Sequence, residues 1–119
     1  MKAIKYISIA ISLFFLMGCE DVISVDLNTA APRLVVDATI NWQKGTNGAV
    51  QKIILSTTTD YYSNVIPKVS GATVSIKNST NSSYTFIEIP NTGEYQCNNF
   101  KPVIGETYTL TIIYNGQTY

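Results

Sequence analysis

Beyond residue 32, apolar and polar residues alternate in short segments that are separated by turn-forming residues. The segment 33–42, RLVVDATINW, shows the pattern clearly, since one face would carry Leu34, Val36, Ala38, Ile40 and Trp42. A period of two is typical of half-buried β-strands, and no helical period appears in this part of the chain. We therefore predict a strand here, with its even-numbered residues facing the core.

The same alternation recurs in five further segments, which are residues 49–59, 72–78, 84–90, 93–97 and 106–119. Glycine, asparagine, serine and proline separate them, most clearly in KGTNG (44–48) and STNSS (79–83). The side chains expected inside are Ile53, Leu55, Ala72, Val74, Ile76, Tyr108, Leu110, Ile112 and Tyr114. Six or seven short strands at this spacing predict an all-β fold, an immunoglobulin-like or transthyretin-like antiparallel β-sandwich.

The last predicted strand runs into Asn115-Gly116, the strongest short signal for a two-residue hairpin turn. Only three residues follow this turn, whereas a strand usually has about five or six. We therefore expect the sandwich domain, residues 33–119, to be incomplete at its C-terminal end.

The first 18 residues have the pattern of a secretory signal peptide. Lys2 and Lys5 precede an apolar run over residues 7–17, which is too short to span a bilayer. The run ends in Leu-Met-Gly-Cys (16–19), which resembles the cleavage motif of bacterial lipoproteins. The resemblance implies cleavage before Cys19, a diacylglyceryl group on its sulfur, and a tether over residues 19–32. The alternative is a retained membrane helix with an incidental cysteine.

Composition and charge narrow the function classes further. Eight basic residues balance eight acidic ones, so nothing suggests a nucleic-acid partner. Cleavage before Cys19 would remove Lys2 and Lys5 and leave six basic against eight acidic residues, a formal charge of −2. Glu20 and Asp21 would then follow the lipid. This pair resembles the surface-export signals of Bacteroidetes lipoproteins, or it is simply the start of a solvated linker.

We find no catalytic site, metal site or cofactor site, and we expect no enzyme activity. Histidine is absent, which excludes a Ser-His-Asp triad. The acidic residues are scattered singly and lack the spacing of a calcium loop, namely Asp37, Asp60, Glu88, Glu94 and Glu106. With Cys19 lipidated, Cys97 has no partner in the chain, and its alternating segment predicts burial. The sequons at Asn78 and Asn81 are read as turn residues.

Three aromatic residues are candidates for ligand or partner contact. Tyr61 and Tyr62 lie in the long connection 60–71, and tyrosine combines apolar area with a hydroxyl group. The alternative, which we favour, is that one ring packs beneath the loop and the other covers an edge. Trp42 would suit a sugar platform, but a tryptophan that ends an inward-facing series more often belongs to the core.

The order of these motifs resembles a known family. VISVDL, RLVVDATI, VQKIILSTTTDYY, PKVSGATVSIKN, NTGEYQC and VIGETYTLTIIYNGQTY follow the lipoprotein motif. This order is similar to the N-terminal part of a Bacteroidetes outer-membrane lipoprotein family, domain of unknown function 4249. The resemblance implies a role in the cell envelope, as an accessory to TonB-dependent uptake receptors or a partner of another envelope protein. It supplies no activity. A surface glycan-binding module that uses the exposed aromatics is the alternative.

Overall fold

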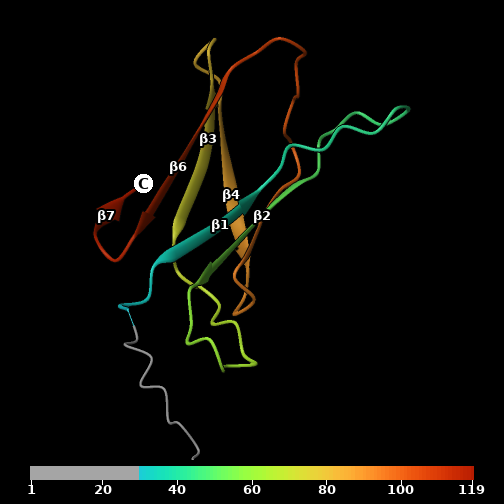
Figure 1. Cartoon of the computed structure of the whole chain (residues 1–119). Helices are drawn as coiled ribbons and strands as arrows, with labels where there is room; N and C mark the ends of the chain where they lie inside the picture. The colour runs from blue at the N-terminus through green and yellow to red at the C-terminus, as the bar shows by residue number, and fades with distance from the viewer. Residues whose placement is uncertain (1–29) are drawn as a thin grey trace, which may run out of the picture.

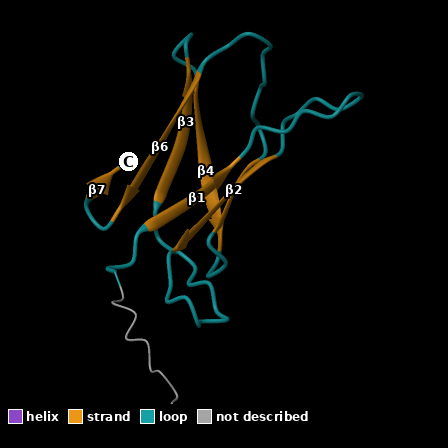
Figure 2. Cartoon of the chain, viewed as in Figure 1, coloured by secondary structure: helices purple, strands orange, loops and turns teal. Residues whose placement is uncertain are grey.

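A computed structural model describes residues 30–119 of the chain (Figure 1). The predicted signal peptide, the predicted lipidation site Cys19 and most of the predicted tether lie outside these residues. The described part contains seven strands and no helix, as Figure 2 shows. The strands are β1 (Leu34–Ala38), β2 (Gln51–Thr57), β3 (Thr73–Asn78), β4 (Ser83–Ile89), β5 (Glu94–Cys97), β6 (Tyr108–Tyr114) and β7 (Gln117–Thr118).

All strand pairs are antiparallel, and the order is β1-β2-β5-β4-β3-β6-β7. The predicted all-β antiparallel fold is thus confirmed. The two layers are joined in one curled sheet, because β4 belongs to both. Its first half pairs with β3, for example Phe86 with Val74, and its second half pairs with β5, for example Ile87 with Gln96.

The concave side of the curled sheet holds the core. Ile53, Leu55, Val74, Ile76 and Ile112 are buried there, as the alternation predicts. Strands β2 to β6 therefore each contribute side chains of one parity to the same interior, which is the packing expected of a half-buried sheet. The remaining buried apolar residues are Val69, Tyr84, Phe86, Tyr95, Cys97 and Phe100.

Strand β1 follows the prediction in orientation but not in burial. Val36 pairs with Leu55 and Ala38 with Ile53, and side chains of directly paired residues share a face, so β1 presents its even-numbered residues to the core. Of the five residues predicted on this face, Leu34 is half-buried and the other four are exposed, with Val36 at 40% and Trp42 at 49%. The prediction that this face is buried is therefore wrong for Val36, Ala38, Ile40 and Trp42. No described segment covers Val36 and Ala38, and Ile40 and Trp42 lie beyond the end of β1, in the hairpin that leads to β2.

Two predicted turns are confirmed. Asn115 and Gly116 have φ angles of 50° and 74°, as a type I′ turn requires, and β7 follows directly. At the β3–β4 turn, the Asn78 side-chain oxygen accepts hydrogen bonds from the Ser82 amide at 2.7 Å and the Thr80 hydroxyl at 3.0 Å. Asparagine thus stabilises this turn through its side chain, as the sequence analysis expects.

The connection between β2 and β3 is held against the sheet by two side chains. The Tyr95 hydroxyl donates a hydrogen bond to the Val69 carbonyl at 2.9 Å and accepts one from the Ala72 amide at 3.0 Å. Glu88 accepts a hydrogen bond from the Gly71 amide at 2.9 Å. Hydrogen bonds from the Ser70 hydroxyl and the Gly71 amide lower the pKa of Glu88, whereas burial raises the pKa of Tyr95. Both titratable groups therefore fix residues 69–72 in place.

Tyr95→Phe should lower the free energy of unfolding by about 1–3 kcal/mol, because the Val69 carbonyl and the Ala72 amide would lose their hydrogen-bond partner in a largely buried position. Urea denaturation followed by circular dichroism measures this change. Tyr61→Phe is the matched control, since the Tyr61 ring is 85% exposed. Equal stability of the two variants would contradict the assigned role of the Tyr95 hydroxyl.

Candidate interaction surfaces

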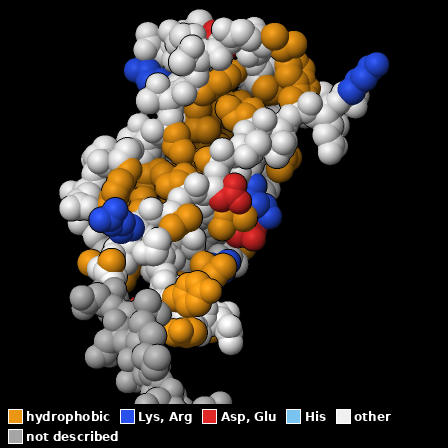
Figure 3. All heavy atoms as spheres, viewed as in Figure 1, with side chains coloured by type: hydrophobic (Ala, Val, Ile, Leu, Met, Phe, Trp, Pro, Cys, Tyr) orange, Lys and Arg blue, Asp and Glu red, His pale blue; other side chains and the backbone are white. Residues whose placement is uncertain are grey.

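An apolar groove opens between β1 and β6. Its cavity has a volume of about 190 Å³, and its apolar lining comes from Ala38, Ile40, Ile53, Ile76, Phe86 and Leu110. Figure 3 shows hydrophobic side chains exposed in the hollow between these two strands. Part of the core-facing side of the sheet is therefore exposed to solvent in this groove.

The strand pairing explains why the groove exists. Strand β1 pairs only with β2, and β6 pairs with β3 and, at its end, with the two residues of β7. Within residues 30–119, then, no strand fills the space between β1 and the first part of β6. An edge strand beside an apolar groove offers free backbone groups and side-chain pockets together, the arrangement by which proteins add an extended peptide to a sheet.

A second hollow lies at the hairpin between β1 and β2. It has a volume of about 580 Å³ and is lined by Trp42, by Thr46 and by the amide side chains of Asn41, Gln43 and Asn47, among others. The Trp42 indole donates a hydrogen bond to the Thr46 carbonyl at 2.9 Å. This bond fixes the ring while about half of its surface stays open to solvent.

Gly48 allows the Trp42 ring to pack closely on the hairpin backbone. A β-carbon at Gly48 would lie 3.1 Å from the ring and 2.5 Å from Pro102, and the φ angle of +63° also favours glycine. The buried Gln51 amide completes the base of the hairpin, since it donates hydrogen bonds to the Asn41 and Gly48 carbonyls. Hydrogen bonds within the hairpin thus hold the residues around the hollow in place.

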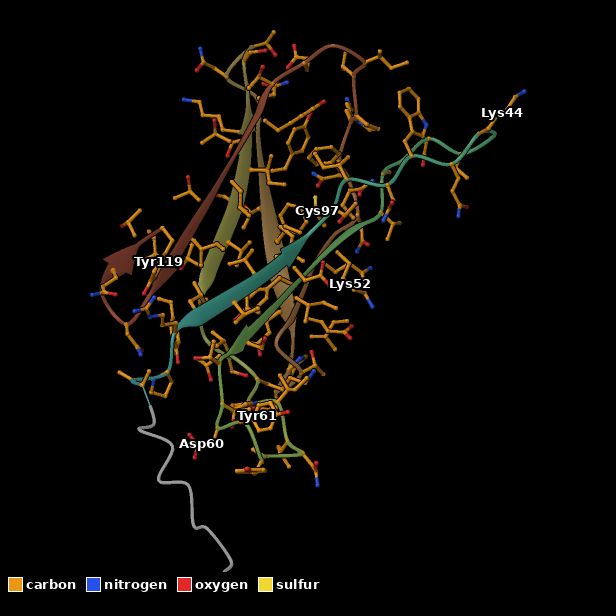
Figure 4. All side chains as sticks on the ribbon, viewed as in Figure 1. Lys44, Lys52, Asp60, Tyr61, Cys97 and Tyr119 are labelled. Carbon is orange, nitrogen blue, oxygen red and sulfur yellow. The ribbon has the colours of Figure 1, made fainter. Side chains whose placement is uncertain are left out.

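Tyr61 and Tyr62 lie in a third place, on the connection between β2 and β3. Their rings contact each other edge to face, with centroids 5.2 Å apart, and they are 85% and 74% exposed. The favoured expectation that one ring packs beneath the loop is therefore wrong. Figure 4 shows Tyr61 at the opposite end of the molecule from Lys44, which marks the tip of the β1–β2 hairpin. Tyr61 and Tyr62 thus belong to a different surface from the Trp42 hollow.

The remaining candidates give no reactive centre. Cys97 is buried, as predicted, and its Sγ lies 3.0 Å from the Asn99 side-chain oxygen. Over residues 30–119, no three acidic or cysteine side chains come together in a way that would hold a metal ion. The same range contains no helix with the length and hydropathy needed to cross a membrane.

Sequence reasoning missed both the groove and the exposed aliphatic residues Val65 and Ile66 beside the tyrosine pair. A signal for the latter exists, because YYSNVIP (61–67) contains five apolar residues without the alternation of a strand, and Pro67 ends the segment before it completes two helical turns. Such a short segment forms neither a strand nor a stable helix with which to join a core. The groove has no comparable signal, since it depends on which strands become neighbours.

The fold and these surfaces define a small antiparallel all-β domain with two sheet edges that leave an apolar groove between them. The chain belongs to the DUF4249 family, domain of unknown function 4249, whose model matches residues 20–119. The match thus includes residues 20–32, which the sequence analysis assigns to a tether. No curated protein and no solved structure gives a significant match.

Proposed function

We propose that the chain is a lipid-anchored protein of the cell envelope, of the outer membrane in particular, whose β-domain binds another envelope component and catalyses no reaction. The observation that carries the binding role is the apolar groove between β1 and β6. The support for the anchor is the lipoprotein motif at residues 16–19. The resemblance to Bacteroidetes outer-membrane lipoproteins favours a TonB-dependent uptake receptor as the partner.

The groove suits an extended segment of such a partner. Apolar side chains of the segment would cover the exposed interior face of β1. Burial of apolar surface contributes about 25 cal/mol per Å², against which the entropy cost of association is set. The backbone of the segment would pair with the outer edge of β1, which pairs with no strand of residues 30–119. Backbone pairing supplies affinity, and the side-chain pockets supply specificity.

Val36→Asp should abolish co-purification of a TonB-dependent receptor from detergent-solubilised membranes, because it places a charge on the face of β1 that would contact the partner. Val35→Asp is the matched control. The two valines are adjacent and equally exposed, at 41% for Val35 and 40% for Val36, but they lie on opposite faces of β1.

Mass spectrometry of the purified material identifies the receptor, and melting temperatures show whether both variants fold. Val36→Thr, which keeps the shape of the side chain, separates a loss of binding from a loss of folding. Absence of any receptor from the wild-type preparation would overturn the uptake role. Equal losses in Val35→Asp and Val36→Asp, with both proteins folded, would remove the interior face of β1 from the binding surface.

Cys19→Ala should eliminate metabolic labelling by an alkyne fatty acid, because the Cys19 sulfur and amine are the proposed acylation sites. Cys97→Ser, which changes the buried cysteine, should leave the labelling unchanged. Gel fluorescence after coupling of a dye to the alkyne measures the incorporated lipid. Labelling of Cys19→Ala at the wild-type level would refute the anchor.

A glycan-binding module is the second candidate function, and the Trp42 hollow is the observation that favours it. A half-exposed indole can stack on the apolar face of a sugar ring, while the neighbouring amide side chains offer both donors and acceptors to sugar hydroxyl groups. Tyr61 and Tyr62 extend into solvent on a different surface, where their exposure leaves them accessible to a ligand.

If this second function holds, Trp42→Ala should abolish saturable binding on a glycan array, whereas Tyr62→Ala should bind as the wild type does. The expected difference arises because Trp42 belongs to the β1–β2 hairpin, whose tip at Lys44 lies at the opposite end of the molecule from Tyr61, the neighbour of Tyr62 (Figure 4). The opposite result would move the sugar site to the tyrosine loop. An array without any saturable signal would leave the receptor-binding proposal as the account of the domain.

A further inference from the structure

We propose that the loop over residues 58–68 contacts the phospholipid surface of the membrane directly, through the side chains of Tyr61, Tyr62, Val65 and Ile66. This proposal rests on the proposed lipid anchor and extends it, because it assigns the face of the domain that lies on the bilayer. We call these four side chains the apolar loop cluster.

The first observation is how far the cluster extends into solvent. Tyr61 and Tyr62 are 85% and 74% exposed, and Val65 and Ile66 are 70% and 63% exposed. Scattered exposed hydrophobic residues are normal on a protein surface, but four within six residues on one loop form a patch that indicates an interaction site. Figure 3 shows hydrophobic side chains exposed at the lower end of the molecule, where this loop lies.

The second observation is where the chain enters the domain. The Arg33 amide donates a hydrogen bond to the Thr58 hydroxyl at 2.9 Å, and the Thr58 amide donates one to the Arg33 carbonyl at 2.9 Å. This reciprocal pair places the residues before β1 directly beside the start of the loop. The first described residues and the loop therefore occupy the same end of the molecule (Figure 1).

The distance along the chain permits the contact. Arg33 lies fourteen positions after Cys19, and a fully extended chain spans about 3.4 Å per residue, so the anchor can lie at most about 50 Å from Arg33. An anchor with this reach raises the effective concentration of the loop at the membrane surface, so that a weak apolar contact becomes occupied.

The side-chain chemistry fits the interface between lipid headgroups and acyl chains. Tyrosine is enriched at that interface because its ring is apolar and its hydroxyl group is polar, and aliphatic side chains enter the adjacent acyl region. No charged residue occurs between Asp60 and Lys68. Lys68, the last residue of the loop, and Arg33, beside its start, are exposed and favour anionic headgroups.

The loop is also held in one shape. The Thr57 amide donates a hydrogen bond to the Pro67 carbonyl at 3.0 Å and closes the base of the loop. The Ser63 amide donates one to the Asp60 carbonyl at 2.9 Å and forms a turn around the two tyrosines. A loop that is already ordered loses less conformational entropy when it binds.

The test uses the chain from Cys19 onward, coupled through the Cys19 thiol to a maleimide lipid in vesicles of phosphatidylethanolamine and phosphatidylglycerol. Cys97 is buried and does not compete for the coupling. The reporter protein carries Tyr62→Trp together with Trp42→Phe, so that its one tryptophan lies in the loop. Phospholipids with bromine atoms near the headgroup end of the acyl chains quench tryptophan only where it enters that layer.

The expected result is strong quenching of the loop reporter and loss of that quenching when Tyr61, Val65 and Ile66 are also replaced by serine. The unmodified protein is the control, since Trp42 is its sole tryptophan and lies in the hairpin at the opposite end. An unquenched loop reporter would overturn the proposal. Equal quenching of Trp42 would overturn it as well, because the domain would then have no preferred membrane face.

The coupling step replaces the natural lipid, so the loop and the anchor are tested separately. The loop reporter could be quenched in vesicles while Cys19→Ala is still labelled at the wild-type level in cells. This result would refute the anchor but would support the membrane affinity of the loop. Labelling lost in Cys19→Ala, combined with an unquenched loop reporter, would uphold the anchor and refute the membrane-facing loop.

Discussion

The division of β4 between two partners is the constraint on which the rest of the structure depends. Its first residues pair with β3 and its last residues with β5, so the sheet turns within this strand. The turn brings β2 and β5 over β3 and β6 and encloses the core on the concave side. Tyr84 and Phe86 lie in the half that pairs with β3, and both are buried. Without this sharing, a seven-stranded antiparallel sheet would be an open surface with both faces in contact with solvent.

Alternation in the sequence predicts the strands well because it reports the face of each residue. The buried positions Ile53, Leu55, Val74 and Ile112 follow from the period of two alone, as does the burial of Cys97. The period does not report whether anything covers a face. Val36 lies on the interior face but stays 40% exposed, since burial there depends on a neighbouring strand rather than on the alternation in its own segment.

The candidate residues Trp42, Tyr61 and Tyr62 show that the sequence pattern also fails to predict exposure outside the strands. Trp42 continues an inward-facing series in the sequence, but β1 ends at Ala38 and the chain leaves the sheet before it reaches the tryptophan. Tyr61 and Tyr62 lie in a connection without strand alternation that Pro67 keeps too short for a stable helix, so the sequence alone does not distinguish packing from exposure. In the structure, the rings pack on each other rather than on the core. In irregular segments, whether an aromatic residue is packed or exposed is thus decided by the tertiary structure and not by the sequence pattern.

The position of β1 relates the proposed surfaces to one another. The strand starts at Leu34, directly after the Arg33–Thr58 hydrogen bonds, and leads to the hairpin that carries Trp42 at the other end. If the apolar loop cluster lies on the bilayer, the groove beside β1 rises from the membrane surface along the flank of the domain. A receptor embedded in the same membrane would then approach the groove sideways, whereas the Trp42 hollow would face away from the lipid. One orientation therefore accommodates the anchor, a membrane-embedded partner and a free outer end together.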